Sequence, residues 1–324
     1  MQPSVAFATD LHAPAAGEFA ADVRLGLSAF PRRIPPRWLY DALGSALFEA
    51  ICQLPWYRIT RAERVLLDEA APAIAERLPD ITSVIELGPG SGEKLASLVS
   101  SIILHRRPLT AHLVDVSDHA LDLASRTLAR VPGLRVCRHL ATFEAGLREA
   151  VAAPSLGARL VAFLGSNIGN VEPAEQDAFL AGIAAHLRPG DALLLGTDLV
   201  KPERDLLLAY DDPIGVTAAF NRNLLARINR ELGADFDLRR FRHYAFYNPA
   251  AGRIEMHLVS RRAQEVHIGD VTVSFAEGES IHTENSHKYD EKTLEALAAR
   301  AGFRIERRWT DSHGWFADLL LVAS

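Results

Sequence analysis

The sequence predicts an α/β protein with a doubly wound, mostly parallel sheet and a second, smaller α+β unit. Three observations predict this fold. Short apolar runs alternate with helical segments between residues 83 and 198, which is typical of a parallel sheet covered on both faces. The first run, Ser83–Leu87, leads directly into a glycine-rich turn. Two final strands, expected over Phe303–Thr310 and Trp315–Ala323 and joined by a short turn, predict a terminal antiparallel hairpin.

Residues 1–61 lack this alternation. Apolar residues recur at helical spacing over Ala20–Leu27 and again over Trp38–Ile51, and prolines at positions 31, 35 and 36 separate the two segments. A further helix is expected over Arg61–Leu78, just before the first strand.

Five parallel strands are expected in the alternating region: Ser83–Leu87, Ala111–Val116, Leu134–His139, Leu160–Gly165 and Ala192–Asp198. Several end at a glycine or an acid, namely Gly88, Asp115, Gly165 and Asp198. Because ligands bind beyond the carboxyl ends of strands in such sheets, these positions mark the expected site.

The alternation stops at Lys201. A largely helical stretch is expected over Leu206–Leu232, followed by antiparallel strands at Phe241–Asn248, Arg253–Ser260 and Gln264–Phe275. A helix is then predicted with Asp290 as its N-cap and Gly302 just past its end. The sequence therefore divides into a nucleotide-binding domain, 62–200 with 288–324, and a substrate-binding domain, 1–61 with 201–287. We expect the substrate in the crevice between them.

Composition narrows the class of protein. The chain has 324 residues, of which 48% are hydrophobic and 23% charged, with a net charge of −6 that argues against a nucleic-acid partner. No apolar run reaches the roughly 20 residues of a membrane span, and no leader-like segment is visible. Cys52 and Cys137 are expected as buried free thiols. The sequence favours a cytoplasmic protein and, since no heptad seam is evident, a monomer.

The segment Val84–Lys94 predicts a cofactor site. Glycines at positions 88, 90 and 92 let the chain approach a ligand closely, and Glu86 stands just before them. A negative charge there would favour a cationic, nucleotide-like cofactor over a pyrophosphate. Asp115, at the end of the next strand, could accept hydrogen bonds from ribose hydroxyls or cap a helix. Because a nicotinamide cofactor also has a ribose, Asp115 does not distinguish a nicotinamide cofactor from another nucleotide-like cofactor.

Two further positions belong to the expected cofactor site. Thr142 and Phe143 follow the third strand, where such folds hold an adenine ring, although Phe143 could equally be core. Lys94 lies in the first turn of the following helix and could bind the cofactor or face solvent.

Long, unusual motifs run through nearly the whole chain. By these motifs the sequence resembles the histidine-specific Nα-methyltransferases of ergothioneine biosynthesis, whose core is a Rossmann-like methyltransferase sheet. The motifs are LPWY (54–57), ELG (86–88), FLGSNIGN (163–170), LGTDLVK (195–201), AYDD (209–212), TAAFNRN (217–223), RIEM (253–256) and TENS (283–286).

The resemblance implies trimethylation of the α-amino group of L-histidine to hercynine with S-adenosyl-L-methionine. It assigns the cofactor to Gly88, Lys94, Asp115, Thr142 and Phe143. The amino acid's carboxylate and amine fall to Tyr57, Asn170 and Tyr210, and its imidazole to Glu284 and Ser286, with Met256 lining the pocket. Asn285 is also expected among the substrate-binding residues. Thr142 departs from the family, which often has an acid there, so weaker cofactor binding is expected.

The residue types suit this chemistry. Neutral imidazole has one N–H donor and one acceptor, which Glu284 and Ser286 can match. The ammonium must lose a proton before each transfer, and Tyr40, Tyr57 or water beside Asn170 are the candidate acceptors. Three alternatives remain open: an α-N-methyltransferase of another amino acid, a nicotinamide-dependent oxidoreductase, and a non-catalytic sensor of S-adenosylmethionine or an amino acid.

Overall fold

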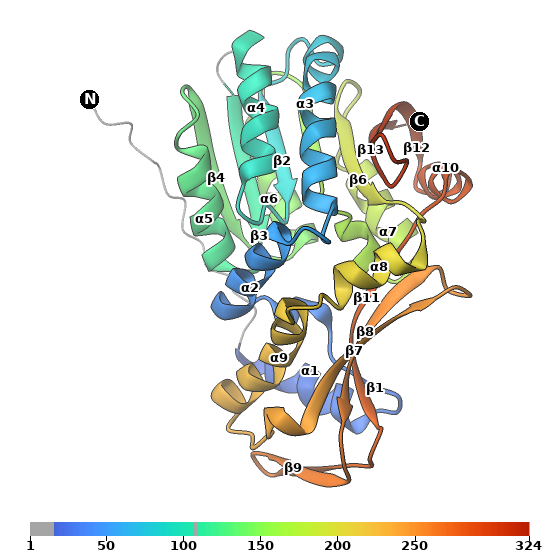
Figure 1. Ribbon diagram of the computed structural model, residues 1–324. Helices are drawn as coiled ribbons and strands as arrows, with labels where there is room; N and C mark the ends of the chain where they lie inside the picture. Colours follow the sequence, from blue (N-terminus) through green and yellow to red (C-terminus); the bar gives the residue numbers. More distant parts are fainter. Residues whose placement is uncertain (1–15, 106–108, 324) are drawn as a thin grey trace. The chain divides into compact units, whose positions relative to one another are not determined.

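The computed structural model describes residues 16–105 and 109–323 (Figure 1). These residues form two compact units. Residues 59–105, 109–200 and 288–323 make up the first, and residues 16–58 and 201–287 make up the second.

The first unit is built on a seven-stranded sheet with the order β12-β13-β6-β5-β2-β3-β4. Strand β13 runs in the direction opposite to the other six strands and pairs with β6 on one side and β12 on the other. The predicted parallel strands and terminal hairpin are thus confirmed. The strands are β2 (Ser83–Leu87), β3 (Leu109–Asp115), β4 (Leu134–Leu140), β5 (Arg159–Phe163), β6 (Ala192–Asp198), β12 (Phe303–Thr310) and β13 (Phe316–Ala323).

Helices cover both faces of this sheet (Figure 1). Helices α3 (Ile59–Arg77), α4 (Glu93–His105) and α5 (Asp118–Leu128) pack their apolar residues on one face. Helices α6 (Phe143–Ala152), α7 (Pro173–Ala184) and α10 (Glu291–Arg300) pack on the other, and the short 3-10 helix η2 (Asn167–Asn170) follows β5. Asp290 caps α10 in a reciprocal capping box, as the sequence predicts.

The second unit contains a four-stranded sheet with the order β1-β11-β8-β7 and a separate β9–β10 hairpin. Helices α8 and α9 pack against β7 and β8, and α2 packs against α9. The elements are α1 (Ala16–Ser28), β1 (Arg32–Arg33), η1 (Pro36–Leu39), α2 (Ala42–Gln53), α8 (Glu203–Tyr210), α9 (Val216–Leu232), η3 (Leu238–Arg240), β7 (Phe241–Asn248), β8 (Arg253–Ser260), β9 (Gln264–Ile268), β10 (Val271–Phe275) and β11 (Ser280–His287).

Two sequence expectations were wrong in this unit, one about a strand and one about the start of a helix. The strand expected over Gln264–Phe275 is a hairpin, because Gly269 adopts a left-handed turn with φ 59°. The stretch Leu206–Leu232 is largely helical, as expected, and consists of α8 and α9 separated by residues 211–215; there Asp212 accepts backbone hydrogen bonds from Ile214, Val216 and Thr217. Helix α2 begins after Asp41, its N-cap, rather than at Trp38.

Strand β11 was not predicted, and it contains a β-bulge. His282 pairs with His257, but Glu284 pairs with Met256, so Thr283 is an extra residue in the ladder. Its hydroxyl donates to the Met256 carbonyl at 3.0 Å. Because side chains alternate along a strand, the bulge moves Glu284 and Ser286 to the face of Met256 and leaves His282 and Asn285 on the opposite face.

The structure describes both cysteines and the lengths of the helices, about which the composition gave expectations. Cys52 is buried and Cys137 is only half-buried, because β4 is an edge strand, and neither of these two cysteines forms a disulfide. Within residues 16–105 and 109–323, each helix is too short or too polar to span a membrane.

Candidate functional site

The glycine-rich turn lies at the carboxyl end of β2, between β3 and β5, where the strand order reverses. Gly88, Gly90 and Gly92 have φ of 77°, 53° and 75°, a conformation that other residues rarely adopt. A Cβ on Gly88 would lie 2.8 Å from Asn167 Nδ2, and one on Gly92 would lie 2.8 Å from the Cα of Ala124. The turn is therefore closely packed, and only glycine fits it.

Glu86 stands just before the glycine turn. Its side chain is fully buried, neither carboxyl oxygen has a hydrogen-bond partner among the described residues, and burial raises its pKa to about 8. Near pH 7 the carboxyl is mostly protonated. The expectation that its negative charge selects a cationic cofactor therefore stays a prediction; burial raises the pKa of Glu86, and Lys94 partly opposes that effect.

Lys94 is fixed by a residue that the sequence reading missed. Its Nζ donates to Oε2 of Glu63 at 2.7 Å, and Glu63 is fully buried on α3. The same carboxylate accepts from the Gly165 N–H, at 2.7 Å to Oε1 and 2.9 Å to Oε2. Glu63 thereby connects α3, the first turn of α4 and the loop after β5, which positions the lysine and this loop together.

Room for this carboxylate comes from Gly196 on β6, where a Cβ would lie 2.0 Å from Glu63 Oε1. Asp318 on β13 is also fully buried, and burial followed by repulsion from Glu63 raises its pKa well above the usual range. The half-buried Lys94 thus interacts with three buried carboxyls, Glu63, Glu86 and Asp318, and burial raises the pKa values of Glu86 and Asp318.

Asp115 ends β3 at the same edge of the sheet as the glycine turn. It accepts a hydrogen bond from the Ser117 N–H at 2.9 Å, and burial raises its pKa to about 6. It does not cap α5, because Ser117 takes that role. At neutral pH it is mostly ionised, with lone pairs available for two hydroxyl donors.

Thr142 and Phe143 begin α6. The Thr142 hydroxyl caps this helix by accepting from the Ala145 N–H at 3.4 Å, and the residue is exposed. Phe143 is half-buried, with its ring edge-on to Phe163 at 5.3 Å between centroids. The glycine turn, the Asp115 carboxylate and a half-buried aromatic ring therefore fit an adenosine group, and the Thr142 hydroxyl keeps a lone pair for it.

The second unit brings together several predicted substrate residues. Glu284, Ser286 and Met256 are buried on one face of the sheet, with Met256 directly across the ladder from Glu284. The Tyr210 hydroxyl lies 2.7 Å from the Ser286 hydroxyl. This group presents an acid and two hydroxyls in an otherwise apolar setting, which suits a small polar ring.

Tyr57 lies beside this group. Its ring centroid is 6.5 Å from that of Tyr210, and its pKa is raised well above the usual range by burial, then by Tyr210, with a smaller contribution from Glu284. The phenol is therefore a hydrogen-bond donor at neutral pH, and this argues against Tyr57 as the acceptor of the amine proton. Tyr40 packs edge-on to Phe48 and Phe220, with centroids 5.5 Å away in both cases.

Three polar residues that the sequence reading did not single out position these tyrosines. His243 is buried; its Nε2 lies 2.8 Å from the Tyr210 carbonyl, and its Nδ1 lies 2.9 Å from Asn221 Nδ2. This arrangement assigns the proton to Nε2. Asn223 Nδ2 donates to Asp41 Oδ1 at 2.7 Å, next to Tyr40. Asn221 and Asn223 are two residues apart on α9, and their spacing in the sequence does not reveal which residues they contact.

Two predicted substrate residues do not join this group within the second unit. The Asn285 side chain lies on the opposite face of the sheet, with its Oδ1 2.8 Å from His282 Nε2. Asn170 belongs to the first unit, at the end of η2.

A sheet whose last strand is reversed, with a close-packed glycine turn and a strand-end acid at its carboxyl edge, defines a methyltransferase of the Rossmann-like class. The chain belongs to the family described as histidine-specific, SAM-dependent methyltransferase, which residues 19–323 match.

Curated relatives agree with this family. Histidine N-alpha-methyltransferase of Mycolicibacterium smegmatis is 44% identical over 314 residues, covering 95% of this chain and 96% of that protein. The protein of the same name from Mycobacterium tuberculosis is 44% identical over 91% of this chain and 92% of its own length. Ergothioneine biosynthesis protein 1 of Neurospora crassa is 28% identical over 90% of this chain, which corresponds to 33% of that protein.

Proposed function

We propose that this protein transfers three methyl groups in succession from S-adenosyl-L-methionine to the α-amino group of L-histidine, yielding hercynine for ergothioneine biosynthesis. Family membership supports the reaction class. The observation that carries the choice of substrate is the pair Glu284 and Ser286, buried on one face of β11 with the Tyr210 hydroxyl alongside.

The first unit is proposed to bind the cofactor. Asp115 accepts from the ribose hydroxyls, Phe143 flanks the adenine, and Gly88 allows the close approach of the backbone. Lys94, held by Glu63, offers a cation for the carboxylate of the methionine moiety. When bound, the cofactor supplies an activated methyl group on a sulfonium ion.

The second unit is proposed to read the histidine. Glu284 accepts from the imidazole N–H, and Ser286, oriented by Tyr210, donates to the other ring nitrogen. Met256 forms an apolar wall. Tyr57, protonated because of its raised pKa, donates to the substrate carboxylate, and Asn170 is proposed to share that role.

Methyl transfer requires the amine lone pair in line with the methyl group, about 3–3.5 Å away. The ammonium must first lose its proton, and the raised pKa of Tyr57 leaves Tyr40 or a water beside Asn170 as the proposed acceptor. After the third transfer no N–H donor remains on the product, so the contacts made through that donor are lost and release is favoured.

The proposal is tested by incubating the protein with S-adenosylmethionine and single amino acids and recording products by mass spectrometry. Histidine alone should be methylated, and mono- and dimethylhistidine should also be substrates. Methylation of a different amino acid in preference to histidine would contradict the assignment. That the protein is a cytoplasmic monomer remains a prediction, which gel filtration with light scattering would test for the oligomeric state.

A further inference from the structure

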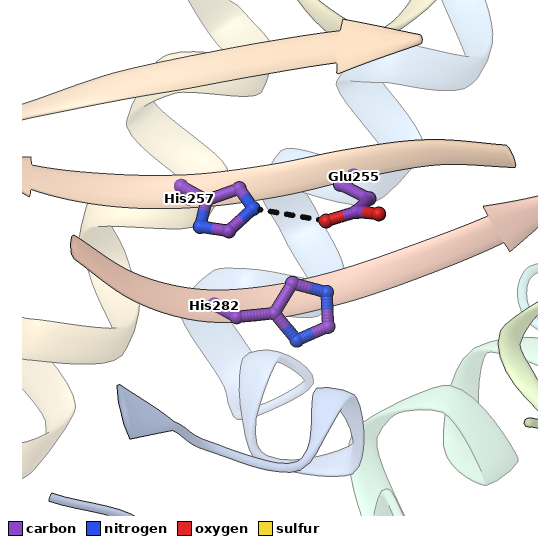
Figure 2. A group of neighbouring side chains, drawn as sticks. All are labelled: Glu255, His257 and His282. Carbon is purple, nitrogen blue, oxygen red and sulfur yellow. Dashed lines mark hydrogen bonds and ion pairs between the residues drawn. The ribbon is translucent and has the colours of Figure 1, made fainter. Parts of the chain in front are cut away.

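A cluster of ligand-type side chains lies on the sheet face opposite the proposed histidine pocket. Glu255 and His257 are two residues apart on β8 and so point to the same side, and His282 on β11 is the direct ladder partner of His257. Figure 2 shows the three side chains gathered across these two neighbouring strands. One donor atom from each lies within 4.8 Å of the others.

Each side chain of this cluster is oriented by a neighbour. His257 Nδ1 lies 3.2 Å from Ser280 Oγ, so its Nε2 faces the cluster. Glu255 Oε1 accepts from Asn248 Nδ2 and from Arg253 Nε, both at 2.9 Å, which leaves Oε2 facing His257 Nε2 at 3.3 Å. Partners that fix ring orientation and carboxylate direction in this way are typical of metal sites.

The β-bulge adds a fourth donor. It brings the Asn285 side chain to the same face as His282, with Oδ1 2.8 Å from His282 Nε2. In a regular strand, residues three apart would lie on opposite faces. Two imidazoles, one carboxylate and one amide side chain therefore lie on one face of the sheet beside the bulge.

These spacings suit a metal ion after a small adjustment. Zinc bonds of about 2.0–2.2 Å place tetrahedral ligand atoms about 3.4 Å apart. The 3.3 Å separation of Glu255 Oε2 and His257 Nε2 already matches that spacing, and it is long for a hydrogen bond. The three ligand atoms lie within 4.8 Å of one another, so each side chain would move by about 1 Å or less to reach the spacing of zinc ligands.

We propose that Glu255, His257 and His282 bind a divalent transition metal ion, with Zn²⁺ the best match to two imidazoles and one carboxylate, and that Asn285 Oδ1 or water completes its coordination. Arg253 Nε pairs with the outer carboxylate oxygen, Oε1, and the proposal assigns the inner oxygen, Oε2, as the ligand. The ion is structural: it ties β8 to β11 across the bulge and thereby fixes the register that turns Glu284 and Ser286 toward the other face. The proposal does not depend on the reaction proposed above.

The test uses the untagged full-length protein, stripped with a chelator and titrated with Co²⁺ and Zn²⁺. We expect one ion per chain by calorimetry, a visible Co²⁺ absorption spectrum typical of nitrogen and oxygen ligands, and a rise in Tm with Zn²⁺. His257→Gln and His282→Gln should each abolish stoichiometric binding. Ser280→Ala, which removes only the outer partner of His257, should weaken it about 10- to 100-fold.

His267→Gln is the matched control, because His267 is an exposed histidine on β9 paired with Asp235. It should leave the metal affinity unchanged. The proposal is overturned if the stripped protein shows no saturable binding, or if His282→Gln, with a circular dichroism spectrum like that of the parent, binds the ion as tightly as the parent. S-adenosylhomocysteine affinity, measured in each variant, reports that the first unit remains folded.

Discussion

The hydroxyls of Tyr210 and Ser286 lie 2.7 Å apart, joining the end of α8 to β11 inside the second unit. Ser286 has one proton and Tyr210 has one, so their mutual hydrogen bond decides which group donates to a bound ligand. The pair therefore acts as one unit in the proposed reading of the imidazole. His243 holds the backbone of Tyr210 from behind, which fixes the geometry.

Tyr210→Phe and Ser286→Ala should each weaken histidine binding and leave the affinity for S-adenosylhomocysteine unchanged. Because the two hydroxyls act together, the double variant should lose less than the sum of the single losses, with a coupling energy of about 0.5–3 kcal/mol. Calorimetric titration of all four proteins measures this. Strictly additive losses would show that the two hydroxyls contribute to ligand binding independently.

Glu284→Gln should weaken histidine binding by about 10- to 100-fold, since a hydrogen bond to a charged acceptor contributes about 1.5–3 kcal/mol. Substrate kinetics at saturating S-adenosylmethionine test this. Glu277→Gln, an exposed acid in the turn before β11, is the control and should behave like the parent. Equal histidine affinity in Glu284→Gln and the parent would remove Glu284 from the pocket.

Asp115→Asn should weaken S-adenosylhomocysteine binding by about 10-fold or more at pH 8, because the ionised carboxylate is the proposed acceptor for the ribose hydroxyls. Burial raises the pKa of Asp115 to about 6, so the affinity of the parent should decrease as the pH falls through that value. The variant should show a flatter pH dependence between pH 5 and 8. The exposed Asp118→Asn on α5 serves as the control for calorimetry.

Glu86→Gln tests the buried carboxyl before the glycine turn. Because the folded-state pKa is raised from 4.5 to about 8, the folded protein holds a proton that the unfolded chain releases between these values. The free energy of unfolding should therefore decrease as the pH rises across this range, by at most about 1.4 kcal/mol per pH unit from this group.

Glu86→Gln cannot titrate, so its stability should fall less steeply with pH in urea unfolding at pH 5 to 8. Asp318 is present in both proteins, and its contribution cancels in the comparison. Parallel stability curves would mean that Glu86 is already ionised in the folded protein.

Much of the first unit could be predicted from sequence, because its strands are short apolar runs bounded by glycine or acidic residues. The glycine turn, Asp115 and the terminal hairpin lie where local patterns placed them. The charge state of Glu86 could not be predicted. It depends on burial and on Lys94, Glu63 and Asp115, which the fold brings near Glu86 from other helices and strands.

The second unit was harder to predict, and β11 shows why. Its sequence, SIHTENSH, is polar apart from Ile281 and carries no apolar alternation that would mark a strand. Regular alternation would also have placed His282, Glu284 and Ser286 on one face. The bulge at Thr283 separates them, and it depends on a tertiary hydrogen bond from the Thr283 hydroxyl to Met256 on β8.

The most direct test of the proposed function is the mass of the product formed from L-histidine and excess S-adenosylmethionine by the purified protein. The account predicts histidine carrying three methyl groups, all on the α-amino nitrogen, with mono- and dimethylated species appearing only transiently. Methylation that stops after one step, or that falls on the imidazole ring, would contradict it.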